Sequence, residues 1–217
     1  MKLAVIDTTV HGKLIGGGHL IIVDLLRGLM ARGHDVHFVS ADTPDPAIND
    51  KIVSTGVTMH QRIWGNGAPI DDLTPMAARW FNELGADVHL ISTSWDLGWT
   101  VLPLLDPRIA TLTIGHNDQE TFYSPVRHYK KFLTRAIGVS DEICRKYVDE
   151  CGMPAERVEW IPYGVATSDK EPVTAASGPL KLVYVGRFEN TQKRISDVIK
   201  IVYKSDAANK VLFGMLR

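Results

Sequence analysis

The sequence predicts an α/β protein with a parallel sheet, and three observations carry this prediction. Short apolar runs alternate along the chain with longer amphipathic segments, which is typical of strands and helices that take turns in a parallel sheet. Glycine-rich or polar loops follow several of the apolar runs, where such a sheet places its binding loops. With 217 residues, 45% of them hydrophobic and 23% charged, the chain is long enough for one full core and part of another.

The first elements form one strand–helix–strand unit. The first predicted strand, Lys2–Ile6, is short and apolar, and a glycine-rich loop separates it from a helix predicted over residues 18–32. Gly33, a residue type that accepts the left-handed conformation, is expected to end this helix before a second strand at Asp35–Ser40. The apolar positions that follow the i, i+3, i+4, i+7 spacing of one buried helix face are Ile22, Leu25, Leu26 and Leu29.

The middle of the chain continues the alternation. An acidic, proline-containing loop leads to a predicted strand at Val57–Ile63. Thr74 is predicted to cap the next helix, with Pro75 in its first turn. A later helix is predicted to begin at Ser140 and to end at Gly152. The remaining predicted strands of this part are Val88–Ser92, Ile109–Ile114, Ile137–Ser140 and Val158–Ile161.

A change of composition separates two domains. Residues 165–179 are small, polar and proline-containing, with neither a helix nor a strand period, and are predicted to be a linker. Residues 1–164 form the first predicted domain, and residues 180–217 begin a second. Because a domain usually has at least about 50 residues, this second domain is expected to be incomplete. Its predicted strand, helix and strand are Leu180–Val185, Ile195–Tyr203 and Val211–Phe213.

Charge and residue usage exclude several classes of protein. A formal net charge of −1 provides no field that would attract a phosphate backbone, so nucleic acid is not expected as a partner. There is no apolar run of about 18 residues and no leader-like start, which predicts a cytoplasmic protein. Cys144 and Cys151 fall on one helical face and are expected to be small buried thiols. The histidines show no spacing typical of zinc, so no metal is expected.

The first candidate binding loop contains Gly16-Gly17-Gly18-His19 between the first strand and its helix. Without Cβ atoms the backbone can approach an anion closely, so a phosphate fits there, and the alternative is a flexible turn. The spacing of a dinucleotide site would need glycine where Ile21 stands. Lys13 is followed by Leu14, which excludes a Walker A motif. A nicotinamide cofactor is therefore disfavoured.

Three further loops follow predicted strands. Trp95 and Asp96 lie after one strand, and a polar run from His116 to Glu120 lies after the next. A histidine at a strand's carboxyl end is placed for proton transfer or for binding hydroxyls, as on sugars. The alternative is a turn in which the run bonds its own backbone. Arg187 and Lys193 share the loop that opens the second domain, where they suit a diphosphate unless they form only a solvated basic turn.

Together these motifs resemble a known family, the retaining GT-B glycosyltransferases of family 4, which transfer a sugar from a nucleotide diphosphate sugar to an acceptor. The resemblance covers nearly the whole chain and implies two Rossmann-like domains, with no metal and no cofactor. The motifs that carry it, in order, are the Gly16-Gly17-Gly18-His19 loop, the helix end Leu29–Val36, Gly138-Val139-Ser140, the segment Glu156–Val165 and Tyr184-Val185-Gly186-Arg187.

The resemblance implies roles for individual residues. Gly17 and Gly18 are expected to face the donor diphosphate, and Arg187 and Lys193 to bind it from the other side. His116 is expected to be the catalytic residue near the reacting sugar, where stabilising the leaving diphosphate matters more than a strong base. The candidate acceptor-binding residues are His19, Trp95, Asp96, Asn117, Asp118 and Glu120.

The sequence also departs from the family pattern. Tyr163 stands where the family has asparagine, Ala166 where it has aspartate, and Arg194 where glycine is common. The family's Glu-x7-Glu motif is not within these residues, so the chain alone is expected to be inactive. A noncatalytic sugar-binding or interaction module, and one subunit of a split transferase, stay open as alternatives. The expected partners are a nucleotide-sugar donor and a carbohydrate, lipid or small-molecule acceptor, while peripheral membrane contact and association with a second chain also stay open.

Overall fold

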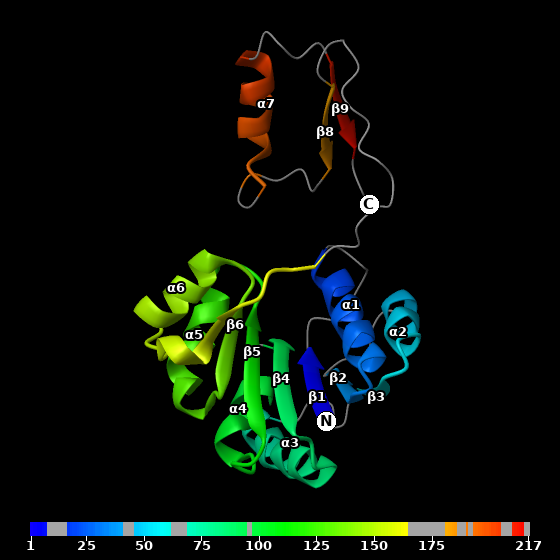
Figure 1. Cartoon of the computed structure of the whole chain (residues 1–217), viewed down its shortest axis with the longest axis vertical. Coiled ribbons are helices and arrows are strands. Elements are labelled where there is room, and N and C mark those ends of the chain that lie inside the picture. Colours follow the sequence, from blue (N-terminus) through cyan, green and yellow to red (C-terminus); the bar gives the residue numbers. More distant parts are fainter. Residues whose placement is uncertain are drawn as a thin grey trace. The chain divides into compact units, whose positions relative to one another are not determined.

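The computed structural model describes residues 1–7, 17–40, 46–61, 69–94, 97–164, 181–185, 190, 193–204 and 210–214. The chain divides into two compact units, Met1–Gly164 and Val165–Arg217 (Figure 1). None of the helices in the described ranges is long and apolar enough to cross a membrane.

A seven-stranded sheet forms the centre of the first unit. All of its strands are parallel, and their spatial order is β3-β2-β1-β4-β5-β6-β7. The α/β class with a parallel sheet is therefore confirmed. The order reverses between β1 and β4, the point at which parallel sheets open a crevice at the carboxyl ends of their strands. The strands are β1 (Lys2–Asp7), β2 (Asp35–Ser40), β3 (Thr58–Gln61), β4 (Val88–Thr93), β5 (Ala110–Gly115), β6 (Arg135–Gly138) and β7 (Val158–Trp160).

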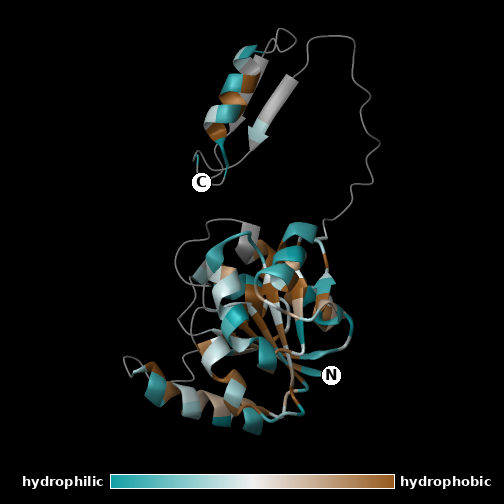
Figure 2. Ribbon diagram, turned by 90° about the vertical axis from the view of Figure 1, so that its left-hand side faces the viewer, coloured by the Kyte–Doolittle hydropathy of each residue, from teal (hydrophilic) through white to brown (hydrophobic). Residues whose placement is uncertain are grey.

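Helices cover both faces of this sheet. Alternate residues of β1 enter different cores: Leu3 and Val5 pack with α1 and α2, whereas Ala4 and Ile6 pack with α3 to α6. Figure 2 shows the apolar residues gathered along the strands, with polar residues on the outer helix faces. The helices are α1 (Gly17–Ala31), α2 (Pro46–Val53), α3 (Ile70–Leu84), α4 (Leu97–Thr100), α5 (Glu120–Tyr129) and α6 (Asp141–Asp149), with 3-10 turns at Leu102–Leu104, Lys130–Phe132 and Ala155–Arg157.

The start of α3 corrects the sequence prediction. The helix begins at Ile70, so Thr74 does not cap it, and Pro75 lies inside it. The Thr74 hydroxyl instead donates to the carbonyl oxygen of Ile70 at 2.8 Å. The physical reason lies in the first turn, where the carboxylates of Asp71 and Asp72 favour a helix amino terminus.

Other boundaries follow the sequence more closely. Gly33 and Gly152 end their helices in the left-handed region, with φ of 76° and 68°. Both cysteines are free thiols, but only Cys151 is buried and Cys144 is partly exposed. The expectation of two buried thiols is therefore wrong for Cys144.

The predicted start of α6 is confirmed at Ser140, whose Oγ accepts a hydrogen bond from the Ile143 N–H at 3.3 Å. Substitution Ser140→Ala should lower the free energy of unfolding by about 1 kcal/mol, because one helix-terminal N–H loses its acceptor. Ser140→Asp keeps an acceptor and is expected to retain most of the stability. Urea unfolding of the three proteins checks this, and an alanine variant as stable as the parent would contradict it.

The second unit contains one strand–helix–strand unit, as predicted. Strands β8 (Lys181–Val185) and β9 (Lys210–Gly214) pair in parallel, and α7 (Ile195–Lys204) connects them. The predicted linker, residues 165–179, lies outside the described residues.

Candidate functional site

The candidate site lies at the carboxyl ends of β4, β5 and β6. His116 follows Gly115, the last residue of β5, and is the first residue of a four-residue polar loop that leads into α5. Because neighbouring parallel strands end at the same edge, Ser92 of β4 comes within reach of this loop. The edge therefore presents a histidine beside hydroxyl groups.

His116 has a hydrogen-bond partner at each ring nitrogen. Its Nε2 lies 3.1 Å from Ser92 Oγ, and its Nδ1 lies 2.5 Å from the hydroxyl oxygen of Tyr163. The Tyr163 ring stacks on the imidazole, with centroids 5.9 Å apart and planes at 16°. Phe122 meets the same imidazole by its edge at 6.2 Å. The histidine is thus fixed in position and in ring orientation.

The surroundings keep His116 neutral. Burial lowers the pKa of its imidazole to about 4, although a hydrogen bond with the Ser92 backbone opposes the shift. Burial also raises the pKa of Tyr163 to about 12, so the phenol keeps its proton. Near neutral pH the imidazole therefore carries one N–H donor and one acceptor nitrogen. A neutral imidazole can exchange hydrogen bonds with hydroxyl groups, and a role of His116 in binding a sugar or passing a proton stays a prediction.

Two carboxylates, Asp118 in the loop and Glu120 at the start of α5, form ion pairs within the first unit. Asp118 accepts hydrogen bonds from Lys146 Nζ at 2.8 Å and from the Tyr123 hydroxyl at 2.7 Å. Lys146 and then Tyr123 lower the pKa of this carboxyl. Glu120 pairs with Arg127. The contacts of Asp118 fasten the loop to α5 and α6, which is a structural role that the sequence did not indicate, whereas the Glu120–Arg127 pair lies within α5.

Glycines allow α6 to pack closely below the loop. A Cβ atom added to Gly115 would lie 2.3 Å from the Tyr147 hydroxyl oxygen and 2.9 Å from Ile143 Cγ2. A Cβ atom added to Gly138 would lie 2.5 Å from Cys144 Sγ. All three distances are shorter than a normal Cβ contact, so the ends of β5 and β6 need glycine here.

The remaining predicted site residues show no contact with His116 among the described side chains, belong to the second unit, or lie outside the described residues. Gly17 and Gly18 form the first turn of α1 with His19, whose side chain is not described. Lys193 is exposed and precedes α7 in the second unit. Of the predicted site residues, the structure brings together His116, Asn117, Asp118 and Glu120; Trp95, Asp96 and Arg187 lie outside the described residues.

Metal ligands do not gather in this part of the chain. Within the described ranges, no group of three or more histidine, cysteine, aspartate or glutamate side chains could hold a metal ion.

Sequence reasoning missed the two partners of His116. Ser92 ends a predicted strand, and strand ends adjacent in a parallel sheet are the signal that points to it. The sequence singled out Tyr163 only because a tyrosine stands where the family has asparagine, which did not indicate a contact with His116. Its contact with His116 joins residues 47 positions apart in the sequence.

The sequence matches a family model. The model of Glycosyltransferase Family 4 covers residues 15–169, which is more than half of the chain. No match was found among curated proteins.

Solved structures share the fold at low sequence identity. A glycosyltransferase from Rickettsia africae ESF-5 is 10% identical with a TM-score of 0.65, over 100% of this chain and 68% of that one. The apo form of the lipopolysaccharide outer core galactosyltransferase WaaB is 13% identical with a TM-score of 0.68, over 99% and 60%. Acinetobacter baumannii MurG is 13% identical with a TM-score of 0.55, over 99% and 67%. The chain thus spans roughly two thirds of these proteins, and the likeness concerns the fold alone.

Proposed function

Because the chain belongs to glycosyltransferase family 4, we propose that it takes part in transfer of a sugar from a nucleotide diphosphate sugar to an acceptor, with retention of configuration. The observation that carries the proposal is the neutral, doubly hydrogen-bonded His116 at the carboxyl edge of a Rossmann-like sheet. Its neighbours of the same fold include glycosyltransferases, which supports the reaction class. The cytoplasmic location expected from the sequence is kept as part of this proposal.

The proposed reaction breaks the bond between the sugar's anomeric carbon and the diphosphate oxygen. It forms a bond from that carbon to an acceptor oxygen, whose proton passes to the leaving diphosphate. The diphosphate leaves with added negative charge, so catalysis requires positive groups around it. We assign this task to the free N–H groups at the start of α1, at Gly17 and Gly18, together with Arg187 and Lys193. No metal or cofactor is required by this scheme.

We propose His116 as the residue that contacts the reacting sugar. A neutral imidazole can hydrogen-bond to a sugar hydroxyl without adding a charge next to the reacting carbon. The acceptor would contact the loops that contain His19, Trp95, Asp96 and Asn117. Asp118 and Glu120 fit that role less well, because Lys146 and Arg127 already pair with their carboxylates. The identity of the acceptor is open among carbohydrates, lipids and small molecules.

Titration calorimetry of the 217-residue chain with UDP, GDP and their sugar conjugates tests the donor site. Removing both cations, Arg187→Ala with Lys193→Ala, is expected to weaken nucleotide binding at least about tenfold, because each charge-assisted hydrogen bond contributes about 1.5–3 kcal/mol. The matched control is Lys200→Ala with Lys204→Ala, which removes the same charge from exposed positions of α7. We expect the control to bind as the parent does.

Two results would count against this donor site. Equal binding by the parent and the Arg187→Ala, Lys193→Ala protein would remove these cations from the proposal. If no nucleotide binds to the parent, a noncatalytic sugar-binding module becomes the better interpretation, and glycans would be the next ligands to titrate.

A further inference from the structure

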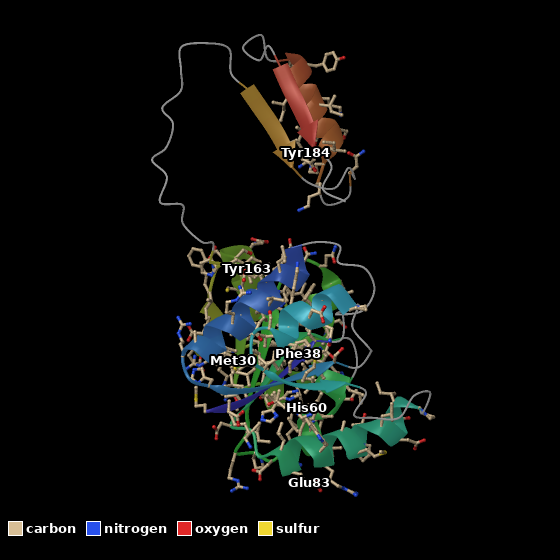
Figure 3. All side chains as sticks on the ribbon, turned by 90° about the vertical axis from the view of Figure 1, so that its right-hand side faces the viewer. Met30, Phe38, His60, Glu83, Tyr163 and Tyr184 are labelled. Carbon is tan, nitrogen blue, oxygen red and sulfur yellow. The ribbon has the colours of Figure 1, made fainter. Side chains whose placement is uncertain are left out.

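Tyr163 contacts His116 from the end of the first unit. It is followed only by Gly164 within that unit, and it lies at the end of the unit to which the strands point (Figure 3). Its side chain is 39% exposed, yet its hydroxyl and its ring both contact the imidazole. A residue that bonds and stacks on the same histidine constrains both the protonation and the rotation of that ring.

Distances indicate which group donates in each hydrogen bond. The 2.5 Å between the Tyr163 hydroxyl oxygen and His116 Nδ1 is shorter than N–H donors reach and lies within the range for O–H donors. The 3.1 Å between His116 Nε2 and Ser92 Oγ is ordinary for an N–H donor. The two distances thus favour a Tyr163 hydroxyl that donates to Nδ1 and an Nε2–H that donates to Ser92.

The opposite arrangement is less favourable. If Nδ1–H donated to Tyr163, the phenolic O–H would need another acceptor. Within the described residues, His116 is the group to which the Tyr163 hydroxyl bonds. In that arrangement the partly exposed phenolic O–H would have to turn to solvent, and the 2.5 Å contact would be too short for an N–H donor.

We propose that Tyr163 is a positioning residue that holds His116 in its Nε2–H tautomer, with Nδ1 as the acceptor on the exposed side. A ligand hydroxyl that replaces the Tyr163 hydroxyl would then have to donate its hydrogen bond to the histidine. Because Tyr163 lies next to the last residue of the first unit, a movement of the chain at this point would break the contact and change the tautomer of His116. The catalytic meaning of this arrangement rests on the proposed function, but the tautomer itself does not.

Nitrogen-15 NMR of the imidazoles in the 217-residue chain at pH 7 tests the proposal, because the two ring nitrogens of each tautomer have distinct chemical shifts. His116→Gln identifies the resonances of His116. In the parent, Nδ1 should have the shift of an unprotonated, hydrogen-bonded nitrogen. In Tyr163→Phe, which removes only the hydroxyl, the ratio of Nε2–H to Nδ1–H tautomer should fall about fivefold, as expected for one lost hydrogen bond.

Two further variants make the result specific. Tyr203→Phe removes a hydroxyl from a tyrosine of α7 that is 88% exposed, and should leave the His116 resonances unchanged. Ser92→Ala should keep the Nε2–H tautomer, because Tyr163 still donates to Nδ1. The proposal is overturned if the parent shows Nδ1–H, if Tyr163→Phe changes nothing, or if Ser92→Ala changes the tautomer more than Tyr163→Phe does. None of these readouts depends on a nucleotide or an acceptor, so failure of the donor-site titration would leave this test intact.

Discussion

Substitution Gly115→Ala is expected to lower the free energy of unfolding by about 3 kcal/mol, the upper part of the usual range for overpacking a core. The new methyl group would lie 2.3 Å from the Tyr147 hydroxyl oxygen and 2.9 Å from Ile143 Cγ2. Tyr147 has no exposed surface, so its ring cannot swing into solvent. The loss should appear as a lower urea midpoint, and because His116 is the next residue, ligand binding should weaken as well.

A second substitution makes this explanation testable. The Tyr147 hydroxyl has no hydrogen-bond partner among the described residues, so Tyr147→Phe alone should change stability little. In the background of Gly115→Ala, however, Tyr147→Phe removes the closest atom and should recover part of the loss. Ile143 Cγ2 and the Tyr147 Cζ remain within 3.0 Å, so the recovery should be incomplete.

The matched control places the same methyl group where space exists. Gly28 lies inside α1, and among the described residues an added Cβ would contact only an Arg32 guanidinium nitrogen at 3.4 Å. Gly28→Ala should therefore stabilise the protein by about 0.5–1 kcal/mol, as alanine does in a helix interior. Equal effects of Gly115→Ala and Gly28→Ala would show that packing against Tyr147 does not limit position 115.

The strands of the first unit could be predicted because their signals are local. The central strands β1, β2, β4 and β5 are short and largely apolar, and the left-handed glycines at 33 and 152 mark where helices stop. Helix α5 was missed because its local signals conflict: it contains Pro125, and its first residue, Glu120, belongs to a polar run. Burial of Tyr123 and Val126 against the sheet stabilises it. Helix α2 was not predicted either, because it directly follows an acidic, proline-containing loop.

The site could be predicted only in part, for a related reason. A histidine after a strand is a local pattern, so His116 was identified. Its partners Ser92 and Tyr163 come close to it only because of the order of the strands in the sheet. A single sequence does not show which strands lie next to each other. The same limit applies to Asp118, which was a candidate for acceptor binding, although Lys146, 28 positions away, pairs with its carboxylate. Only a contact between residues far apart in the sequence shows whether such a carboxylate is free to bind a ligand or is part of a structural ion pair.

Acidification from pH 7 to pH 4.5 is expected to remove several kcal/mol of stability through two histidines. Burial lowers the pKa of His89 to about 4, and burial does the same to His116. In the unfolded chain histidine titrates near 6.5, so below that pH the unfolded state binds more protons and stability falls as pH falls. For the fully buried His89, about 2.5 pH units at about 1.4 kcal/mol each give a loss of roughly 3 kcal/mol by pH 4. His116 is partly exposed and should contribute less.

Geometry explains why His89 resists protonation and how the effect can be isolated. Its Nε2–H donates to the Gly98 carbonyl oxygen at 3.1 Å, its Nδ1 has no partner in the described part of the chain, and Phe81 covers the ring at 4.6 Å. His89→Gln can still donate to that carbonyl but does not titrate, so it should show a shallower fall in urea-unfolding stability between pH 6.5 and 4.5. His128→Gln, at an exposed position, should follow the parent. Paired carboxylates such as Asp118 contribute little to the change in stability between pH 6.5 and 4.5. The stability that depends on their lowered pKa is lost only below about pH 4. A parallel pH dependence in His89→Gln and the parent would place the acid sensitivity outside this core.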